Sequence, residues 1–202
     1  ELLSVYLFIP GVIALILLII SVMLTSVTLA REKETGTMEL LSILPIKPLM
    51  IVVGKVIPYL LLSVINCFVV VLMGIFIFKL PMNGSILLLA LECTLYIITS
   101  LSIGILISTM VETQQAAMFM SLVSLMMPTM LLSGFIFPIE SMPAVLQYIS
   151  KIIPATHFIK IIKTIMIKGE GLHIIWKETL ILLGMTLMLI TISVRKIQKQ
   201  YQ

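Results

Sequence analysis

The sequence predicts an all-α membrane protein, built as a bundle of about five transmembrane helices. Of its 202 residues, 60% are hydrophobic and 11% are charged, and its mean hydropathy is +1.25. A soluble globular domain carries about 25% charged and about 45–50% apolar residues, so most of this chain must face an apolar solvent. A helix needs about 20 apolar residues to cross a bilayer. Helices of that length leave little chain for a soluble catalytic domain.

Long apolar runs carry the expected spans, and short polar turns separate some of them. The turn KLPMNG at residues 79–84 holds Pro, Asn and Gly, which end helices and make turns. The connection VETQQ at residues 111–115 is too short for anything but a tight turn. Residues 1–202 are therefore expected to form a single transmembrane domain. The expected spans are residues 6–30, 49–78, 85–110, 116–135, and 174 or 175 to 194.

The segment between residues 133 and 171 differs from the spans. Pro138, Pro143 and Pro154 interrupt it, and four lysines lie in its second half. It is too charged for one span and too apolar for a solvated loop. Residues 155–168 have the pattern of an amphipathic interfacial helix. One face of that helix carries Phe158, Ile161, Ile162, Ile165 and Met166, and the other carries Lys160, Lys163 and Thr164.

A shorter helix is expected before it, from about Ser141 to Lys151. Ser is a favoured helix cap, and Pro143 follows it closely, which suits the first turn of a helix. Two short helices that dip into one face of the bilayer fit the three prolines. The expected re-entrant helical segment covers residues 135–170.

The charges gather at loops and membrane edges, and the net charge is +4. No basic run exceeds two consecutive residues, so the positive balance indicates anionic lipid headgroups rather than nucleic acid. Five spans would place seven Lys and Arg on the side of residues 31–55 and the other six opposite. This difference is too small to orient the protein. Cys67 and Cys93 have no CxxC spacing, so neither a disulfide framework nor a zinc site is indicated.

Catalytic motifs are missing from the sequence. Gly54 and Lys55 are followed by Val56, and no Gly lies five residues before Gly54, so a nucleotide-binding loop is not formed. His157 and His173 lie 16 residues apart, and neither HExxH nor GxSxG occurs. We therefore expect no catalytic residues, no metal ligands and no cofactor bound by this chain.

Glu92 is the one acid that lies well inside an expected span. A carboxylate in the membrane is costly unless it is paired or hydrated, and it often marks a substrate or ion pathway. Asn66 is a candidate companion on the preceding span. The sequence leaves two interpretations open: a structural carboxyl bonded to Asn66 or to a Ser, or a proton- or ion-coupled transporter or channel that uses Glu92.

The most polar stretch, residues 31–48, must lie at a membrane face. Gly36 between two threonines can end the incoming helix, and Met38, Leu41 and Leu44 then recur every three residues before Pro45. A short helix lying across the membrane face is expected there. The stretch is either a solvated loop or a docking surface, whose alternating charges would give a partner specific ion pairs.

Three motifs resemble type-2 ABC transporter permeases, in the same order along the chain. They are AREKETGTMELLSILPIKPLMIVVGKVIPYLL (residues 30–61), STMVETQQAAM (residues 108–118) and LLSGFIFPIESMPAVLQYISKIIPATHF (residues 131–158). The resemblance covers essentially the whole chain. It is closest to the multidrug-exporter-like subgroup, whose subunits have six spans and a large periplasmic domain between the first two. By this comparison, the chain lacks the first span and the periplasmic domain.

The resemblance implies a function and a set of site residues. The chain would be a permease subunit, not an enzyme, in the cell inner membrane, and would export an amphipathic, lipid-like or drug substrate that the sequence does not identify. ATP and Mg would bind to a separate ABC ATPase subunit, and a second permease subunit, identical or paralogous, would pair with this one. The implied cytoplasmic coupling helix for the ATPase comprises Arg31, Glu32, Lys33, Glu34, Thr35, Gly36, Thr37 and Glu39. The implied outer gate in the re-entrant hairpin comprises Gly134, Pro138, Pro143, Pro154 and His157.

Overall fold

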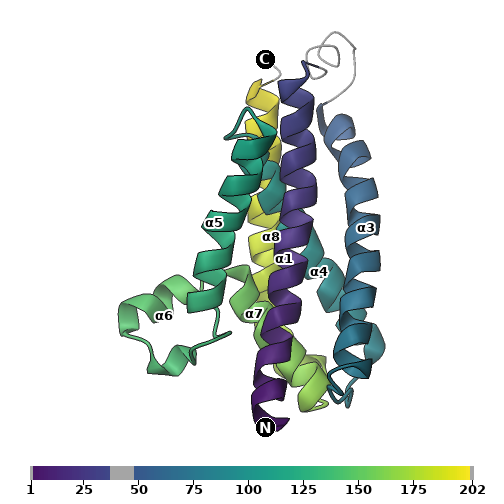
Figure 1. Ribbon diagram of the computed structural model, residues 1–202, viewed down its shortest axis with the longest axis vertical. Helices are drawn as coiled ribbons and strands as arrows, with labels where there is room; N and C mark the ends of the chain where they lie inside the picture. Colours follow the sequence, from purple (N-terminus) through teal and green to yellow (C-terminus); the bar gives the residue numbers. More distant parts are fainter. Residues whose placement is uncertain (1, 37–47, 201–202) are drawn as a thin grey trace.

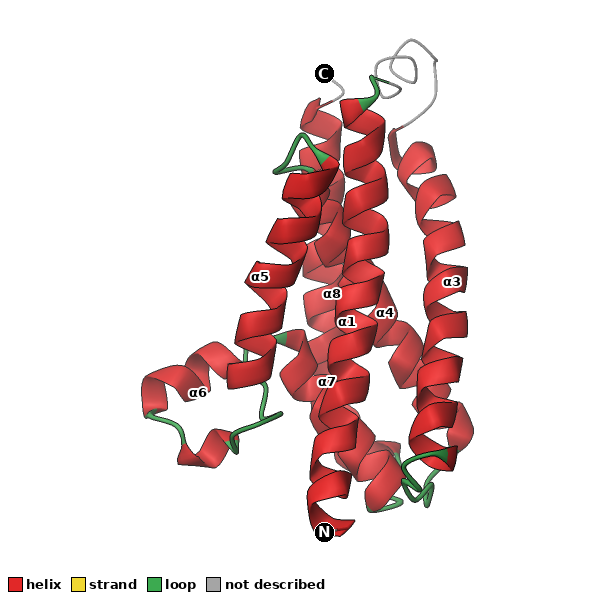
Figure 2. Cartoon of the chain, in the orientation of Figure 1, coloured by secondary structure: helices red, strands yellow, loops and turns green. Residues whose placement is uncertain are grey.

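The computed structural model describes residues 2–36 and 48–200. Within these ranges the chain is helical, with turns but no β-strand (Figure 2). Each of five long helices contains a stretch long and apolar enough to cross a membrane. This confirms the all-α bundle and the number of spans that the sequence predicts. The helices are α1 (Leu2–Glu34), α3 (Pro48–Phe76), α4 (Ile86–Ser108), α5 (Gln114–Leu132) and α8 (Leu172–Gln200) (Figure 1).

Helices α1 and α4 form the centre of the bundle. Half of the membrane-crossing stretch of each is buried, against 11% for α3 and 17% for α5 and α8. Helix α1 packs against α3, α4 and α5, and α4 also packs against α8. In Figure 1, α3 and α5 flank α1 on opposite sides. The outer helices therefore present most of their apolar surface away from the bundle.

Small residues let α1 and α4 approach closely. A Cβ atom on Gly104 would lie 2.8 Å from the carbonyl oxygen of Val22 and 2.8 Å from Cβ of Thr25. The hydroxyl of Ser26 on α1 lies 2.8 Å from that of Ser121 on α5 and extends the small-residue contact to that helix. Lipid tails are as apolar as side chains, so helices in a membrane associate through close packing and polar contacts between them. Gly104 therefore marks a point of close backbone approach between the central pair.

The two ends of the bundle differ. At the end that we call the Glu34 end, α1 finishes beside the α4–α5 turn, and the C-terminal part of α8 lies nearby (Figure 1). At the opposite α7 end lie the short helices of residues 139–167, in the part of the chain where two short helices are predicted. These elements are η1 (Ile139–Ser141), α6 (Ala144–Ser150), α7 (Pro154–Ile162) and the π-helical turn η2 (Lys163–Ile167).

Helices α6 and α7 have different surroundings. The five apolar side chains predicted to share a face in α7 and η2 are all buried, and Lys160 is exposed. An interfacial helix would leave that face to lipid, but here α1, α4 and α8 cover it. Phe158 stacks on Tyr96 of α4 with ring centroids 3.9 Å apart. Helix α6 instead projects from the side of the bundle, with Val145 and Tyr148 exposed (Figure 1).

The α3–α4 turn is bonded to the end of η2. The backbone N–H of Asn83 donates to the carbonyl of Met166 at 3.1 Å, and its side-chain amide donates to the carbonyl of Ile167 at 2.9 Å. Gly84 fits against η2 because a Cβ atom there would lie 2.4 Å from the carbonyl oxygen of Ile165. The KLPMNG turn and the 133–171 segment therefore share one end of the molecule, as five spans require.

Helix boundaries differ from prediction by up to six residues, as at the end of α8, which runs to Gln200 instead of residue 194. Helix α1 runs on to Glu34, four residues beyond the expected end of the first span at residue 30, because no Gly or Pro lies between residue 30 and Gly36. Gly36 has a φ of +71°, a left-handed conformation that suits glycine after a helix end. Helix α5 ends at Leu132 rather than near residue 135. The short helix predicted after Gly36, including Thr37 and Glu39, lies outside the described residues.

Replacing Gly104 by Ala is expected to destabilise the protein by about 1–3 kcal/mol, because a backbone carbonyl blocks the new methyl group. Thermal unfolding of the purified protein in detergent measures the loss. Gly184→Ala is the matched control, since nothing lies within 4 Å of a Cβ at that helical position. Equal melting temperatures for the two variants would contradict the close α1–α4 contact.

Candidate functional site

The last turn of α1 is bonded to both helices that flank the α4–α5 turn. The Lys33 ammonium donates to the carbonyl of Ser108 at the end of α4, at 2.5 Å. The Glu34 carboxylate accepts from the backbone N–H of Gln114 at 2.9 Å and from its side-chain amide at 3.2 Å. A cation at a helix C-terminus and an anion at a helix N-terminus both complement the helix dipole. We call these two bonded pairs the charge clamp.

The charge clamp gives two of the predicted coupling residues an internal partner. Lys33 is half-buried, whereas Arg31 and Glu34 are exposed. The hydroxyl of Thr35 donates back to the carbonyl of Arg31 at 2.9 Å and closes the helix end. The predicted coupling residues from Arg31 to Gly36 thus lie together on a short, charged helix end. The sequence analysis missed Gln114, although its position directly after Thr113, the cap of α5, is a signal of a helix start.

Three polar contacts join α4 to α8 along one line. The hydroxyl of Thr179 donates to the Glu92 carboxyl at 2.7 Å, and the Thr99 and Thr186 hydroxyls lie 2.6 Å apart. Further along, the hydroxyl of Ser193 donates to the carbonyl of Ser102 at 3.0 Å. We call this set of six residues the polar seam.

The α8 side of the polar seam has a regular spacing. Thr179, Thr186 and Ser193 follow one another at intervals of seven residues. Ile175 and Leu182, each four residues before one of the threonines, share the same seven-residue spacing and are buried. A seven-residue repeat keeps one stripe of a helix against a partner helix, as in a coiled coil. This repeat is the sequence signal from which the polar seam could have been found.

Glu92 is 3% exposed, and its two carboxyl oxygens have different surroundings. Oε1 accepts from Thr179, whereas Oε2 is buried without a hydrogen-bond partner. The Asn66 side-chain nitrogen is also buried without a partner, so the two members of the predicted pathway pair do not bond to each other. Among the described residues, no group of three or more His, Cys, Asp or Glu could hold a metal ion. The visible role of Glu92 is thus to hold α8 against α4.

The predicted gate residues are spread along the α7 end rather than gathered at one point. Gly134 has a φ of +78° just after α5, and Pro138 and Pro143 precede η1 and α6. Pro154 is the first residue of α7. His157 is buried, and its Nε2 lies 3.0 Å from the carbonyl oxygen of Lys151, which links α7 to the end of α6. These residues set the bends of the segment.

Phe135 attaches this segment to α1, and the sequence analysis did not single it out. Its ring packs edge-on to that of Phe8, with centroids 5.6 Å apart and an interplanar angle of 74°. It also covers Gly11, where a Cβ atom would lie 2.0 Å from the ring. Helix α1 is therefore bound at one end by the charge clamp and near the other end by Phe135.

The bundle and its polar contacts define a multi-pass α-helical membrane domain. A model of the ABC-2 family transporter protein matches residues 2–195. The probable multidrug ABC transporter permease YbhR of Escherichia coli K12 is 36% identical over 178 residues, which are 88% of this chain and 48% of that protein. The probable multidrug ABC transporter permease YbhS of the same strain is 34% identical over 192 residues, 95% of this chain and 51% of that protein.

The similarity extends beyond bacteria. ABC transporter G family member 20 of Dictyostelium discoideum is 31% identical over 187 residues, 92% of this chain and 26% of that protein. No solved structure matches. The chain belongs to the ABC-2 transporter family and is a multi-pass inner-membrane permease domain. It spans about half the length of its bacterial relatives.

Thr179→Val is expected to destabilise the protein by about 0.6 kcal/mol and by no more than about 1.7 kcal/mol, the average and the maximum measured for hydrogen bonds between membrane helices. The change keeps the side-chain shape but removes the donor to Glu92. Thr191→Val on the same helix is the control, because the exposed hydroxyl of Thr191 bonds only its own helix, at the Leu187 carbonyl. Thermal unfolding in detergent should separate the two variants, and a larger loss for Thr191→Val would count against the polar seam.

Proposed function

We propose that this chain is the membrane part of a permease subunit in an ATP-driven exporter. It would move an amphipathic, lipid-like or drug substrate across the inner membrane, with energy from a separate ABC ATPase subunit. Membership of the ABC-2 family supports the proposal, as do relatives whose names describe multidrug permeases. The observation that carries the coupling role is the charge clamp, which ties the charged end of α1 to α4 and α5.

The charge clamp supplies a physical route for coupling. A partner that moved residues 31–48 would pull on the last turn of α1. Lys33 would transmit that displacement to the end of α4, and Glu34 to the start of α5. Residues Arg31 and Glu32 would contribute ion pairs to the partner, and Thr37 and Glu39 are proposed to take part in the same docking. ATP and Mg would be held by the ATPase subunit.

The substrate path would lie against surfaces that this chain leaves uncovered. Helix α5 exposes Met118, Phe119, Met126 and Met127. Methionine is flexible and polarisable, so such a face can accommodate apolar molecules of many shapes. A second permease subunit, identical or paralogous, would enclose the path from the other side.

The 135–170 segment would act as the outer gate. An apolar hollow of about 590 Å³ separates α5 from the α6 region, with Met127, Leu131, Phe137 and Pro143 among its lining residues. Helix α6 could pivot into this space about the contact between Lys151 and His157 that links it to α7, while α7 stays packed within the bundle. The bends at Gly134, Pro138 and Pro143 are where such a movement would occur.

The coupling role is tested in the full-length protein produced with its ATPase. Changing Glu32, Glu34 and Glu39 together to Gln is expected to lower co-purification of the ATPase and export of a fluorescent drug at least about tenfold, since each lost charge pair weakens docking. Glu178→Gln on α8, outside both the coupling residues and the 135–170 segment, is the control. Glu34→Gln alone removes the charge that would dock the ATPase but keeps an oxygen that can accept from Gln114. Its effect therefore measures the docking role of Glu34 separately from its role in the charge clamp. Unchanged association and export in the triple variant would refute the coupling interface.

Ion-coupled transport through Glu92 is the second candidate, and its support is the unpaired, buried Oε2 atom. The bond from Thr179 favours a structural role instead, because the oxygen of a glutamine could accept it equally well. Glu92→Gln is therefore expected to keep wild-type transport across a pH series from about 5.5 to 8.5. Transport in vesicles under ATP provides the measurement. A lost or newly pH-independent activity in Glu92→Gln would support the ion-coupled candidate over the structural one.

A further inference from the structure

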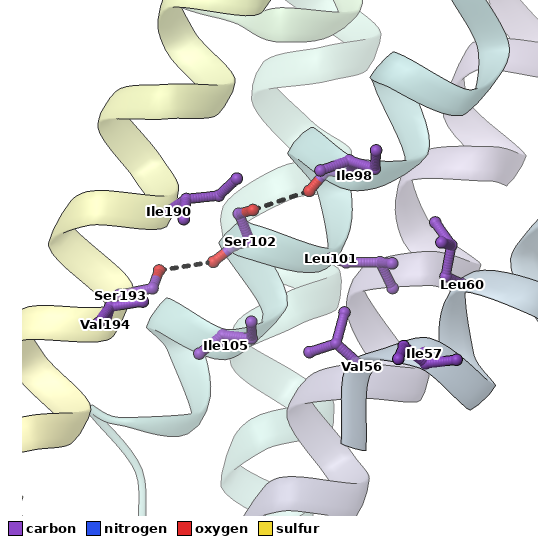
Figure 3. A pocket seen from close by; sticks show the side chains of 10 residues that line it. All are labelled: Val56, Ile57, Leu60, Ile98, Leu101, Ser102, Ile105, Ile190, Ser193 and Val194. Carbon is purple, nitrogen blue, oxygen red and sulfur yellow. Dashed lines mark hydrogen bonds between the residues drawn. The ribbon is translucent and has the colours of Figure 1, made fainter. Parts of the chain in front are cut away.

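A groove between α3, α4 and α8 lies close to the Glu34 end of the bundle. Its volume is about 280 Å³. Figure 3 shows α8 and α3 as its two sides and α4 as its floor. Helices α3 and α8 touch each other far less than either touches α4, so the groove separates them. The lining consists of Val56, Ile57 and Leu60 of α3, Ile98, Leu101, Ser102 and Ile105 of α4, and Ile190, Ser193 and Val194 of α8.

The walls of the groove offer hydrocarbon and almost no free hydrogen-bonding groups. Its two hydroxyl side chains are already bonded within the protein. The Ser102 hydroxyl donates to the carbonyl of Ile98 at 2.8 Å, and the Ser193 hydroxyl donates to the carbonyl of Ser102 at 3.0 Å (Figure 3). Ile57 and Ile190 are 50% and 37% exposed, so the groove opens to the surroundings of the bundle. A flexible apolar chain fits such a groove better than a polar solute does.

Positive charge marks the end of the groove nearest the membrane surface. Arg195 and Lys196 directly follow the lining residues Ser193 and Val194 on α8, and both are exposed. On the other side, Lys55 directly precedes the lining residue Val56 in α3. Basic residues next to a span attract anionic lipid headgroups with about 1 kcal/mol each. The groove therefore combines apolar walls with the exposed cationic residues Arg195 and Lys196 at one end.

We propose that this groove binds one anionic phospholipid from the leaflet at the Glu34 end. One acyl chain lies in the groove between α3 and α8, and the phosphate headgroup contacts Arg195 and Lys196. The bound lipid fills the space that separates α3 from α8 and stabilises their positions on α4. The inference is independent of the transported substrate, since it concerns a resident lipid on the outside of the bundle.

The test uses the full-length protein in detergent with added dioleoyl phosphatidylglycerol or dioleoyl phosphatidylcholine, which carry the same acyl chains. Native mass spectrometry counts retained lipid, and thermal unfolding measures stabilisation. The wild type is expected to retain phosphatidylglycerol on the order of tenfold more strongly than phosphatidylcholine. Soluble glycerol phosphate, which carries the charge but no acyl chains, is expected to leave the melting temperature unchanged.

Two variants divide the site into its parts. Arg195→Gln with Lys196→Gln is expected to abolish the preference for the anionic lipid, whereas Lys160→Gln with Lys168→Gln, at exposed positions of the α7 end, keeps it. Ile57→Trp fills the groove and is expected to lower retention of both lipids. Ile65→Trp, at a 61% exposed position of α3 outside the groove, is its control.

Three results would overturn the proposal. Equal retention of the two lipids by the wild type would show that lipid charge does not affect binding. An unchanged preference in the variant of Arg195 and Lys196 would show that these two residues do not contact the headgroup. If Ile57→Trp altered the oligomeric state while lipid retention stayed the same, the groove would be a protein contact. A variant is used only if its melting temperature without added lipid equals that of its control. If Ile57→Trp does not meet this criterion, Ile190→Trp at the mouth of the groove replaces it.

Discussion

The contact of α1 with α4 at Gly104 is the interaction on which the other packing depends. Inside a bilayer, lipid competes equally for every apolar side chain, so only close approach and hydrogen bonds between helices distinguish one packing from another. Gly104 brings the α4 backbone against Val22. Every other long helix packs against one or both of these two. A wider separation of the central pair would therefore shift all of them.

Helix α1 connects the two ends of the molecule. Lys33 and Glu34 attach its last turn to α4 and α5, and Phe135 holds its other part through Phe8 and Gly11. The two attachments lie on opposite sides of the tight contact at Gly104. Because a helix resists bending over such a length, a tilt imposed at one end must appear at the other. The fold thus supplies the mechanical continuity that the proposed coupling of a remote ATPase to an outer gate requires.

The spans could be predicted from the sequence because hydropathy over about 20 residues is a local property. Gly36 and the three prolines of the 133–171 segment likewise act on their own backbone, so the breaks that they cause were predictable. The partners of Glu34 and Glu92 were not, since Gln114 and Thr179 lie 80 and 87 residues away and meet them only through the packed register of the helices. The burial of α7 could not be predicted for the same reason. An amphipathic pattern identifies an apolar face but not whether lipid or protein covers it.

The seven-residue repeat of the polar seam restricts how α8 can move. A slide of one residue, about 1.5 Å along α4, would move each hydroxyl out of register with its partner, and the next matching register lies about 10 Å away. Intermediate positions break the contacts of Glu92, Thr99 and Ser193 between the two helices, so small sliding motions are unfavourable. Helices α4 and α8 should therefore travel as one rigid body. Any change of shape during a transport cycle would then fall on the contacts that α3, α5 and α6 make with this body.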